Sequence, residues 1–134
     1  MASDKVEFEL VSPERLLLSE LVDMVVVPGA EGDFGVLPRH APLISTLRPG
    51  VIRVFEGREV KERIFVAGGF AEVTPERCTV LAEEAVPVGE IDAAKLEQEL
   101  KDLGEDLADA KSDDEKAAIA KRIAVRKAMQ AAAI

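Results

Sequence analysis

The N-terminal two thirds of the chain have the hydrophobic alternation of a β-protein. Val6, Phe8 and Leu10 alternate with Glu7 and Glu9, which is the period of a strand with one buried and one wet face. Similar short hydrophobic runs occur at 16–18, 24–27, 51–55, 63–67, 70–73 and 79–82. Turn residues separate them, as in 56–58 and 74–77. About eight to ten such strands predict a β-sandwich or flattened barrel.

A glycine-rich segment at 28–35 has the composition of a phosphate-binding loop but lacks its other parts. No Lys-Ser/Thr pair and no predicted helix follow Gly35. The segment therefore matches neither the P-loop motif nor the dinucleotide-binding motif. We interpret these glycines as turns with positive φ between strands. Phe34 and Leu37 would then face either the core or a partner, and the sequence alone does not decide between the two.

The C-terminal third changes to a helical period. Leu96, Leu100, Leu103 and Leu107 form one apolar stripe on a helix that we expect to start near Asp92. Ser112 and Glu115 have the spacing of a capping box and predict a second helix. The second helix carries mostly small residues that would allow close approach to the first, namely Ala117, Ala120, Ile123, Ala124 and Ala128. The pattern therefore predicts an antiparallel two-helix hairpin.

A change in composition separates the two patterns. All seven prolines and all five phenylalanines lie at or before Pro87, and Gly104 is the one glycine after Gly89. Helix formers dominate the rest of the chain. We therefore predict a β-sandwich domain over 1–88 and a helical hairpin over 89–134.

Charge is divided between the two predicted helices. Residues 90–110 hold eight acids and two bases, whereas residues 111–134 hold three acids and six bases. One interpretation is that these charges only form solvated faces of the two helices. The alternative is that the basic second helix exchanges its acidic neighbour for an acidic surface on another protein.

The overall composition removes several classes of function. The net charge of -9 opposes binding to nucleic acid or to an anionic bilayer. Cys78 is the only cysteine, which excludes an intrachain disulfide and agrees with a reducing compartment. No apolar run approaches the roughly 20 residues that span a bilayer, so we expect a soluble, cytoplasmic protein.

Catalytic groups are scarce. His40 is the only histidine, there is no Trp or Tyr, and no nucleophile is paired with a base in the sequence. A β-sandwich hydrolase is therefore the weakest of the functional hypotheses. We interpret His40 as a loop or capping residue and Cys78 as a small core hydrophobe.

Several linked motifs resemble the epsilon subunit of bacterial F-type ATP synthases. They are Val27-Pro28-Gly29, the run from Glu31 to Leu43, Leu47-Arg48-Pro49-Gly50, the run from Val66 to Val73, and Thr79-Val80-Leu81-Ala82. The resemblance covers essentially the whole chain. One departure is Arg39, where the family usually has glycine before His-Ala-Pro.

The resemblance implies a non-catalytic subunit of the central stalk of a membrane-associated, proton-translocating ATP synthase. The β-sandwich would bind the gamma subunit and the c ring, at the cytoplasmic face of the bacterial inner membrane, and would be attached to the membrane only through the complex. The predicted interface with the c ring and stalk consists of Glu31, Gly32, Asp33, Phe34 and His40.

The resemblance also implies that the helical hairpin contacts the alpha/beta catalytic head and restrains ATP hydrolysis. The matching basic residues are Lys121, Arg122, Arg126 and Lys127. No cofactor is required. The alternative is a regulatory ATP-sensing module, because some family members bind ATP between the helices. The corresponding residues are Ile91, Asp92, Lys95, Arg122 and Arg126, but Lys95 replaces an arginine of that motif and lacks its planar fork.

Overall fold

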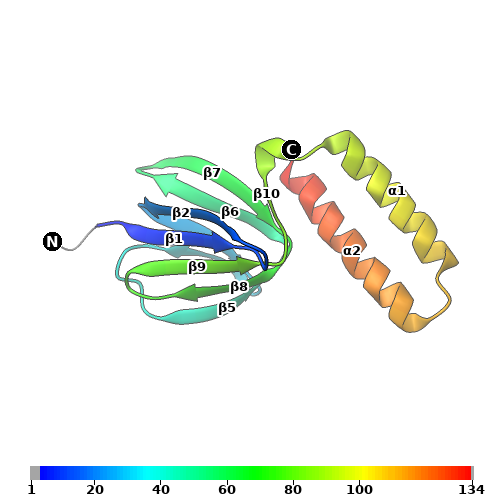
Figure 1. Ribbon diagram of the computed structural model, residues 1–134, viewed down its shortest axis with the longest axis horizontal. Helices are drawn as coiled ribbons and strands as arrows, with labels where there is room; N and C mark the ends of the chain where they lie inside the picture. Colours follow the sequence, from blue (N-terminus) through cyan, green and yellow to red (C-terminus); the bar gives the residue numbers. More distant parts are fainter. Residues whose placement is uncertain (1–3, 134) are drawn as a thin grey trace. The chain divides into compact units, whose positions relative to one another are not determined.

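The structure is a computed structural model that describes residues 4–133. The polypeptide divides into two compact units, of which one ends at Val88 and the other begins at Gly89. Figure 1 shows a β-unit followed by a helical hairpin, and each is described by itself.

The described part of the β-unit contains ten strands. They are β1 (Val6–Val11), β2 (Leu16–Val22), β3 (Met24–Gly29), β4 (Gly32–Val36), β5 (Leu43–Leu47), β6 (Gly50–Glu56), β7 (Glu59–Val66), β8 (Gly69–Val73), β9 (Arg77–Ala82) and β10 (Ala85–Pro87).

One continuous sheet connects these strands and curls on itself. The order is β10-β7-β6-β3-β5-β8-β9-β1-β2, with β4 paired to β3 off this path. Strands β1 and β9 are parallel, and the other described pairs are antiparallel. Near the two ends of this order, Lys61 on β7 forms an ion pair with Glu20 on β2 at 3.2 Å. The predicted β-sandwich, or flattened barrel, is confirmed.

The core lies inside this curled sheet and consists of alternating inward side chains. The pattern is clearest in β1, where Val6, Phe8 and Leu10 are buried and the intervening residues are partly exposed. Phe8, Phe65 and Ile52 are the largest fully buried side chains. Cys78 is fully buried in the same cluster as Phe8 and Ile52, which confirms its interpretation as a core hydrophobe.

The structure differs from the sequence prediction in the glycine-rich segment 28–35. Most of this segment is strand, because β3 runs to Gly29 and β4 begins at Gly32, with only residues 30 and 31 in the turn. Gly32 does have a positive φ of 139°. Gly29 is needed for a different reason, because a Cβ there would lie 2.7 Å from the carbonyl oxygen of Gly32.

After the 3-10 turn η1 (Val88–Glu90), the second unit consists of α1 (Ala93–Asp109) and α2 (Asp113–Ala132). The carboxylate of Asp92 caps α1 by accepting from the Lys95 N–H at 3.1 Å. Ser112 Oγ caps α2 by accepting from the Glu115 N–H at 3.1 Å, and Glu115 Oε2 accepts from the Lys111 N–H at 3.3 Å. Both predicted helix starts are confirmed, since the sequence supplied these side-chain acceptors.

The leucine stripe of α1 is confirmed, but the predicted small-residue face of α2 is wrong. Leu96 and Leu103 are buried, and Leu100 and Leu107 are partly buried. On α2, three of the five predicted residues are exposed, namely Ala117, Ala120 and Ala124. Of the predicted residues, Ile123 and Ala128 are partly buried, and Ile119 and Met129, which were not predicted, are also protected. A larger apolar side chain removes more surface from water, which favours the isoleucines and the methionine over the alanines.

Candidate functional site

Four of the five predicted c-ring and stalk residues lie in or beside the β3–β4 turn, a name used here for residues 29–33. Gly29 pairs with Gly32 across this hairpin, so Ala30 and Glu31 form a two-residue tip. The Ala30 N–H donates to the Thr46 carbonyl at 2.9 Å and ties the tip to β5. Glu31 is exposed at this tip, where its carboxylate is accessible to a partner.

Asp33, by contrast, is engaged within the protein. Its Oδ1 accepts from Nη2 of Arg48, and its Oδ2 lies 3.7 Å from Nη2 of Arg53. Nη1 of Arg48 also donates to the carbonyl of Gly29 at 2.5 Å. The guanidinium of Arg53 lies 6.0 Å from the centroid of the Phe55 ring. Asp33 and Gly29 of the turn are therefore tied to two arginines that lie outside the turn.

Phe34 and Leu37 have opposite environments. Phe34 is partly buried and packs against the core cluster. Leu37, which follows β4, is 55% exposed. The choice that the sequence left open is thus resolved as core for Phe34 and surface for Leu37.

His40 is not brought together with Glu31. It lies in the loop after β4, whereas the turn precedes that strand, and the five residues of β4 span about 13 Å. Its Nδ1 is 2.6 Å from the carbonyl oxygen of Ala41, and its N–H donates to the carbonyl of Leu37 at 3.2 Å. These contacts agree with the interpretation of His40 as a loop residue.

Arg39 has the conformation expected at a glycine position. Its φ is 66°, and within residues 4–133 it is the one non-glycine residue with a positive φ. Its N–H donates to the carbonyl of Pro75 at 2.7 Å, and its guanidinium lies 3.6 Å from Asp4. The departure from the family sequence at this position therefore falls on a backbone that glycine adopts more easily.

Sequence reasoning missed an exposed apolar cluster on β5, β8 and β9. Ile44 is 74% exposed, Phe70 49% and Leu81 42%. Phe70 lies directly opposite Leu81 in the register, and Ile44 is opposite Glu72 on the same outer face. The sequence signal for this cluster was the alternation of side chains along a strand. Because Ala71 and Val73 face the core, Phe70 must face outward. A cluster of this kind is typical of a protein-binding surface.

The four predicted basic residues of α2 do not form one uniform surface. Lys121, Arg122 and Lys127 are exposed. Arg126 is more protected, and its Nε lies 3.3 Å from Oε2 of Glu99 on α1. Arg126 therefore joins the two helices, and the i,i+4 spacing to Arg122 did not indicate this difference.

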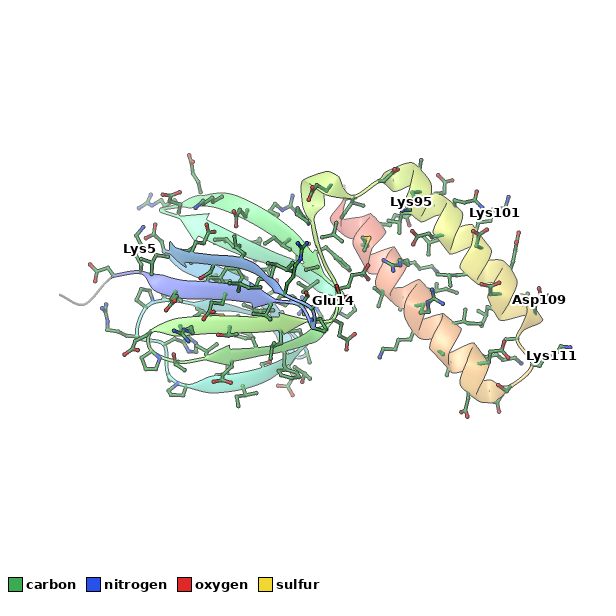
Figure 2. The ribbon with its side chains drawn as sticks, in the orientation of Figure 1. Lys5, Glu14, Lys95, Lys101, Asp109 and Lys111 are labelled. Carbon is green, nitrogen blue, oxygen red and sulfur yellow. The ribbon has the colours of Figure 1, made fainter. Side chains whose placement is uncertain are left out.

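Two of the five residues of the ATP hypothesis have partners within the hairpin itself. Asp92 serves as the N-cap of α1, and Arg126 is paired with Glu99. Lys95, labelled in Figure 2 near the start of α1, is exposed, and the following Leu96 is buried. These contacts stabilise the hairpin, and they leave Arg122 as the exposed arginine of the set.

Little in the described residues supports bond-making chemistry. Residues 4–133 contain no group of three or more His, Cys, Asp or Glu side chains that could hold a metal ion. Burial raises the pKa of the Cys78 thiol to about 12, so it is not poised as a nucleophile.

Across the same residues, neither helix has the length and apolarity needed to cross a membrane.

Comparison with known proteins gives one consistent result for both units. Residues 5–88 match the family described as ATP synthase, Delta/Epsilon chain, beta-sandwich domain. Residues 92–133 match the C-terminal domain of the ATP synthase epsilon chain. The protein is 58% identical over 130 residues to the ATP synthase epsilon chain of Paramagnetospirillum magneticum, covering 97% of this chain and 98% of that protein. It is 53% identical over 132 residues to that of Maricaulis maris, covering 98% of each.

Two solved structures share the fold. A subunit in the cryo-EM structure of the Euglena gracilis mitochondrial ATP synthase, with OSCP, F1 and c-ring, gives a TM-score of 0.82 at 24% identity, covering 97% of this chain and 82% of that one. A subunit of the Tetrahymena thermophila central stalk and c-ring gives 0.72 at 16% identity, with complete coverage of both. On the sequence matches to both units, this chain belongs to the ATP synthase epsilon chain family.

Proposed function

We propose that this protein is a non-catalytic rotor subunit of the central stalk, which couples rotation of the c ring to ATP synthesis in the catalytic head. The β-unit binds the gamma subunit and the c ring. The observation that carries this proposal is the β3–β4 turn, a tied hairpin with an exposed carboxylate at its tip. A rigid acidic turn can dock on basic loops without entering lipid.

The apolar cluster on β5, β8 and β9 supports a second protein contact of the same unit. Ile44 and Phe70 are large side chains that a monomer would leave in water. Together with Glu31 on the β3–β4 turn, they give the β-unit both an apolar and an acidic surface. These two chemistries fit a subunit that is held by more than one neighbour.

The proposal that the β-unit binds gamma is tested by truncation after Val88, followed by reconstitution with gamma. We expect the truncated protein to fold and to co-purify with gamma, because the core cluster lies entirely within the β-unit. Failure of a folded β-unit to co-purify would contradict the proposal. The double variant Ile44→Ser/Phe70→Ser should still fold, since both side chains lie outside the core. It tests whether the apolar cluster on β5, β8 and β9 contributes to co-purification with gamma.

The hairpin is proposed to act as a regulatory arm that contacts the alpha/beta head and restrains ATP hydrolysis. The exposed basic side chains of Lys121, Arg122 and Lys127 support electrostatic contact with an acidic surface. Replacing all four basic residues, including Arg126, by alanine should raise the ATPase activity of the assembled enzyme. Replacing only the three exposed ones tests the same contact while the Arg126–Glu99 pair stays intact. An unchanged rate in both variants would show that this arm does not inhibit.

Nucleotide sensing is the alternative, and family membership does not favour it. If ATP is a regulatory ligand here, equilibrium dialysis of the full-length protein should give sub-millimolar binding that Arg122→Ala removes. We expect no such binding, because Asp92 and Arg126 already have partners in the hairpin. A positive result would move the function of the second unit toward ATP sensing.

We also propose that the protein is peripheral at the cytoplasmic face of the bacterial inner membrane and is attached through the complex alone. The net charge of -9 opposes direct binding to anionic lipid. Membrane fractions from cells that lack gamma should therefore lose this subunit. Its retention on those membranes would indicate another mode of attachment.

A further inference from the structure

The β3–β4 turn is held by a side chain that lies outside the hairpin. Arg48 follows β5, and its guanidinium donates to the carbonyl of Gly29 on one strand and to the carboxylate of Asp33 on the other. Its own N–H donates to the Pro28 carbonyl at 3.1 Å. One residue therefore holds both strands of the turn at the level of its two-residue tip.

The two acids of the turn have different electrostatic environments. Asp33 lies beside two guanidinium groups, those of Arg48 and Arg53, whose charges neutralise it. Glu31 lies at the exposed tip, beyond the strand pair that Arg48 holds. A carboxylate that already faces two cations adds little attraction for a basic partner, whereas an exposed carboxylate adds more.

We propose that Arg48 is the positioning residue of the β3–β4 turn, that Asp33 is its counter-ion, and that Glu31 is the acid that meets a basic partner. This inference rests on the proposed docking of the turn. The planar fork of arginine suits the role, since it can donate to a carbonyl and to a carboxylate at the same time. Lysine at this position keeps the charge and loses that geometry.

The positioning role can be measured on the isolated full-length protein. We expect amide exchange of Ala30 to be about fivefold faster in Arg48→Gln and in Arg48→Lys, because the hydrogen bond of Ala30 to Thr46 depends on the held turn. Asp33→Asn should also speed this exchange. The double variant Arg48→Gln/Asp33→Asn should be no faster than Arg48→Gln alone, since both substitutions break the same contact.

The protein offers a matched control in the β6–β7 hairpin. Glu56 pairs with Glu59 there, so Gly57 and Arg58 form another two-residue tip with an exposed arginine. Arg58→Gln makes the same charge change and should leave both the exchange of Ala30 and the urea midpoint unchanged. The urea midpoint should also stay close to that of the unsubstituted protein in the Arg48 variants, which separates local positioning from loss of the fold.

A second measurement uses the assembled complex and follows ATP-driven proton pumping at several salt concentrations. Arg48→Gln and Arg48→Lys should lower pumping relative to ATP hydrolysis. Glu31→Gln should reduce the dependence of coupling on salt, because it removes the exposed charge of the contact. Asp33→Asn should retain that dependence.

The outcomes separate this inference from the function on which it rests. Unchanged exchange of Ala30 in Arg48→Gln overturns the positioning role. Loss of the salt dependence in Asp33→Asn, or additive effects in the double variant, overturns the assignment of Asp33 as a counter-ion. Faster exchange with unchanged coupling supports the positioning role and contradicts the proposed docking of the turn.

Discussion

The two units of this protein are stabilised in different ways. The β-unit has one continuous cluster of buried side chains contributed by strands that are far apart in sequence. The helical unit has four buried hydrophobic residues among those described, namely Leu96, Leu103, Ala110 and Met129. Caps and an interhelical ion pair contribute to the rest of its order. The β-unit therefore has the larger buried core, and we expect the hairpin to open at a lower cost in free energy.

The largest effect should come from emptying the β-core. Phe8 is fully buried on β1, which pairs with both β2 and β9. Phe8→Ala should lower the free energy of unfolding by about 3–5 kcal/mol, because it removes a large apolar side chain and leaves a cavity. Urea denaturation followed by far-UV circular dichroism measures this loss. A change below about 1 kcal/mol would mean that the site collapses around the smaller residue.

Truncating a leucine of the hairpin should have a more local effect. Leu103 is buried on α1, and Leu103→Ala should cost about 2–3 kcal/mol. We expect faster amide exchange along α1 and α2 with an unchanged transition of the β-unit. If the β-unit were destabilised equally, the two units would unfold together and the comparison would fail.

Replacing the glycine inside α1 should stabilise the helical hairpin. Gly104 lies inside the helix, and a Cβ built there meets nothing within 4 Å. Gly104→Ala should stabilise the hairpin by about 1 kcal/mol, because alanine loses less backbone entropy on folding. Slower amide exchange in α1 is the measurement, and Ala108→Gly on the same exposed helix surface should have the opposite effect.

The neighbouring carboxyl groups of Glu20 on β2 and Glu62 on β7 should make the stability of the β-unit depend on pH. Buried oxygens of Glu20 and Glu62 lack hydrogen-bond partners among the described residues. Desolvation is the largest cause of the raised pKa of Glu62, and the neighbouring carboxylate of Glu20, to which a protonated Glu62 can donate, raises this pKa further. Protonated Glu62 therefore stabilises the fold at low pH, and this contribution is lost as the pH rises through the raised pKa.

Glu62→Gln should consequently increase stability at pH 7 and flatten its decline from pH 4.5 upward. We expect a gain of no more than about 1 kcal/mol, since the group is partly solvated. Urea midpoints across this pH range measure the effect. Glu59→Gln, an exposed change on the same strand, should leave the slope unaltered.

The smallest effect should come from the backbone of Arg39. Arg39→Gly should stabilise the β-unit by about 0.5 kcal/mol, because relief of the left-handed conformation is partly offset by the flexibility of glycine in the unfolded state. Assembly should stay intact. A loss of stability would show that the ion pair with Asp4 outweighs the backbone strain.

Local patterns predicted most of the elements. The alternation of Val6, Phe8 and Leu10 and the Ser112–Glu115 spacing each act over a few residues, so the sequence contains the whole signal. Strands β4, β5 and β10 lie outside the predicted hydrophobic runs. Glycines and polar residues interrupt the alternation of β4 and β5, and β10 has only three residues.

The candidate site was less predictable because its contacts are long-range. Asp33 lies on β4, and its pairing with Arg48 and Arg53 depends on how β4, β5 and β6 come together. The pairing of Arg126 with Glu99 depends on the rotation of α2, where larger apolar residues outweigh the alanines. Spacing along the sequence does not contain this information.

The seclusion of Cys78 has a practical consequence. It is the only cysteine in the sequence, it is fully buried, and its thiol has a pKa of about 12. Maleimides and other thiolate-directed reagents should therefore leave the native protein unmodified. A cysteine introduced at Glu31 or Lys121 would carry a fluorophore or cross-linker at that site alone, so the motion of each unit could be followed without first removing a native thiol.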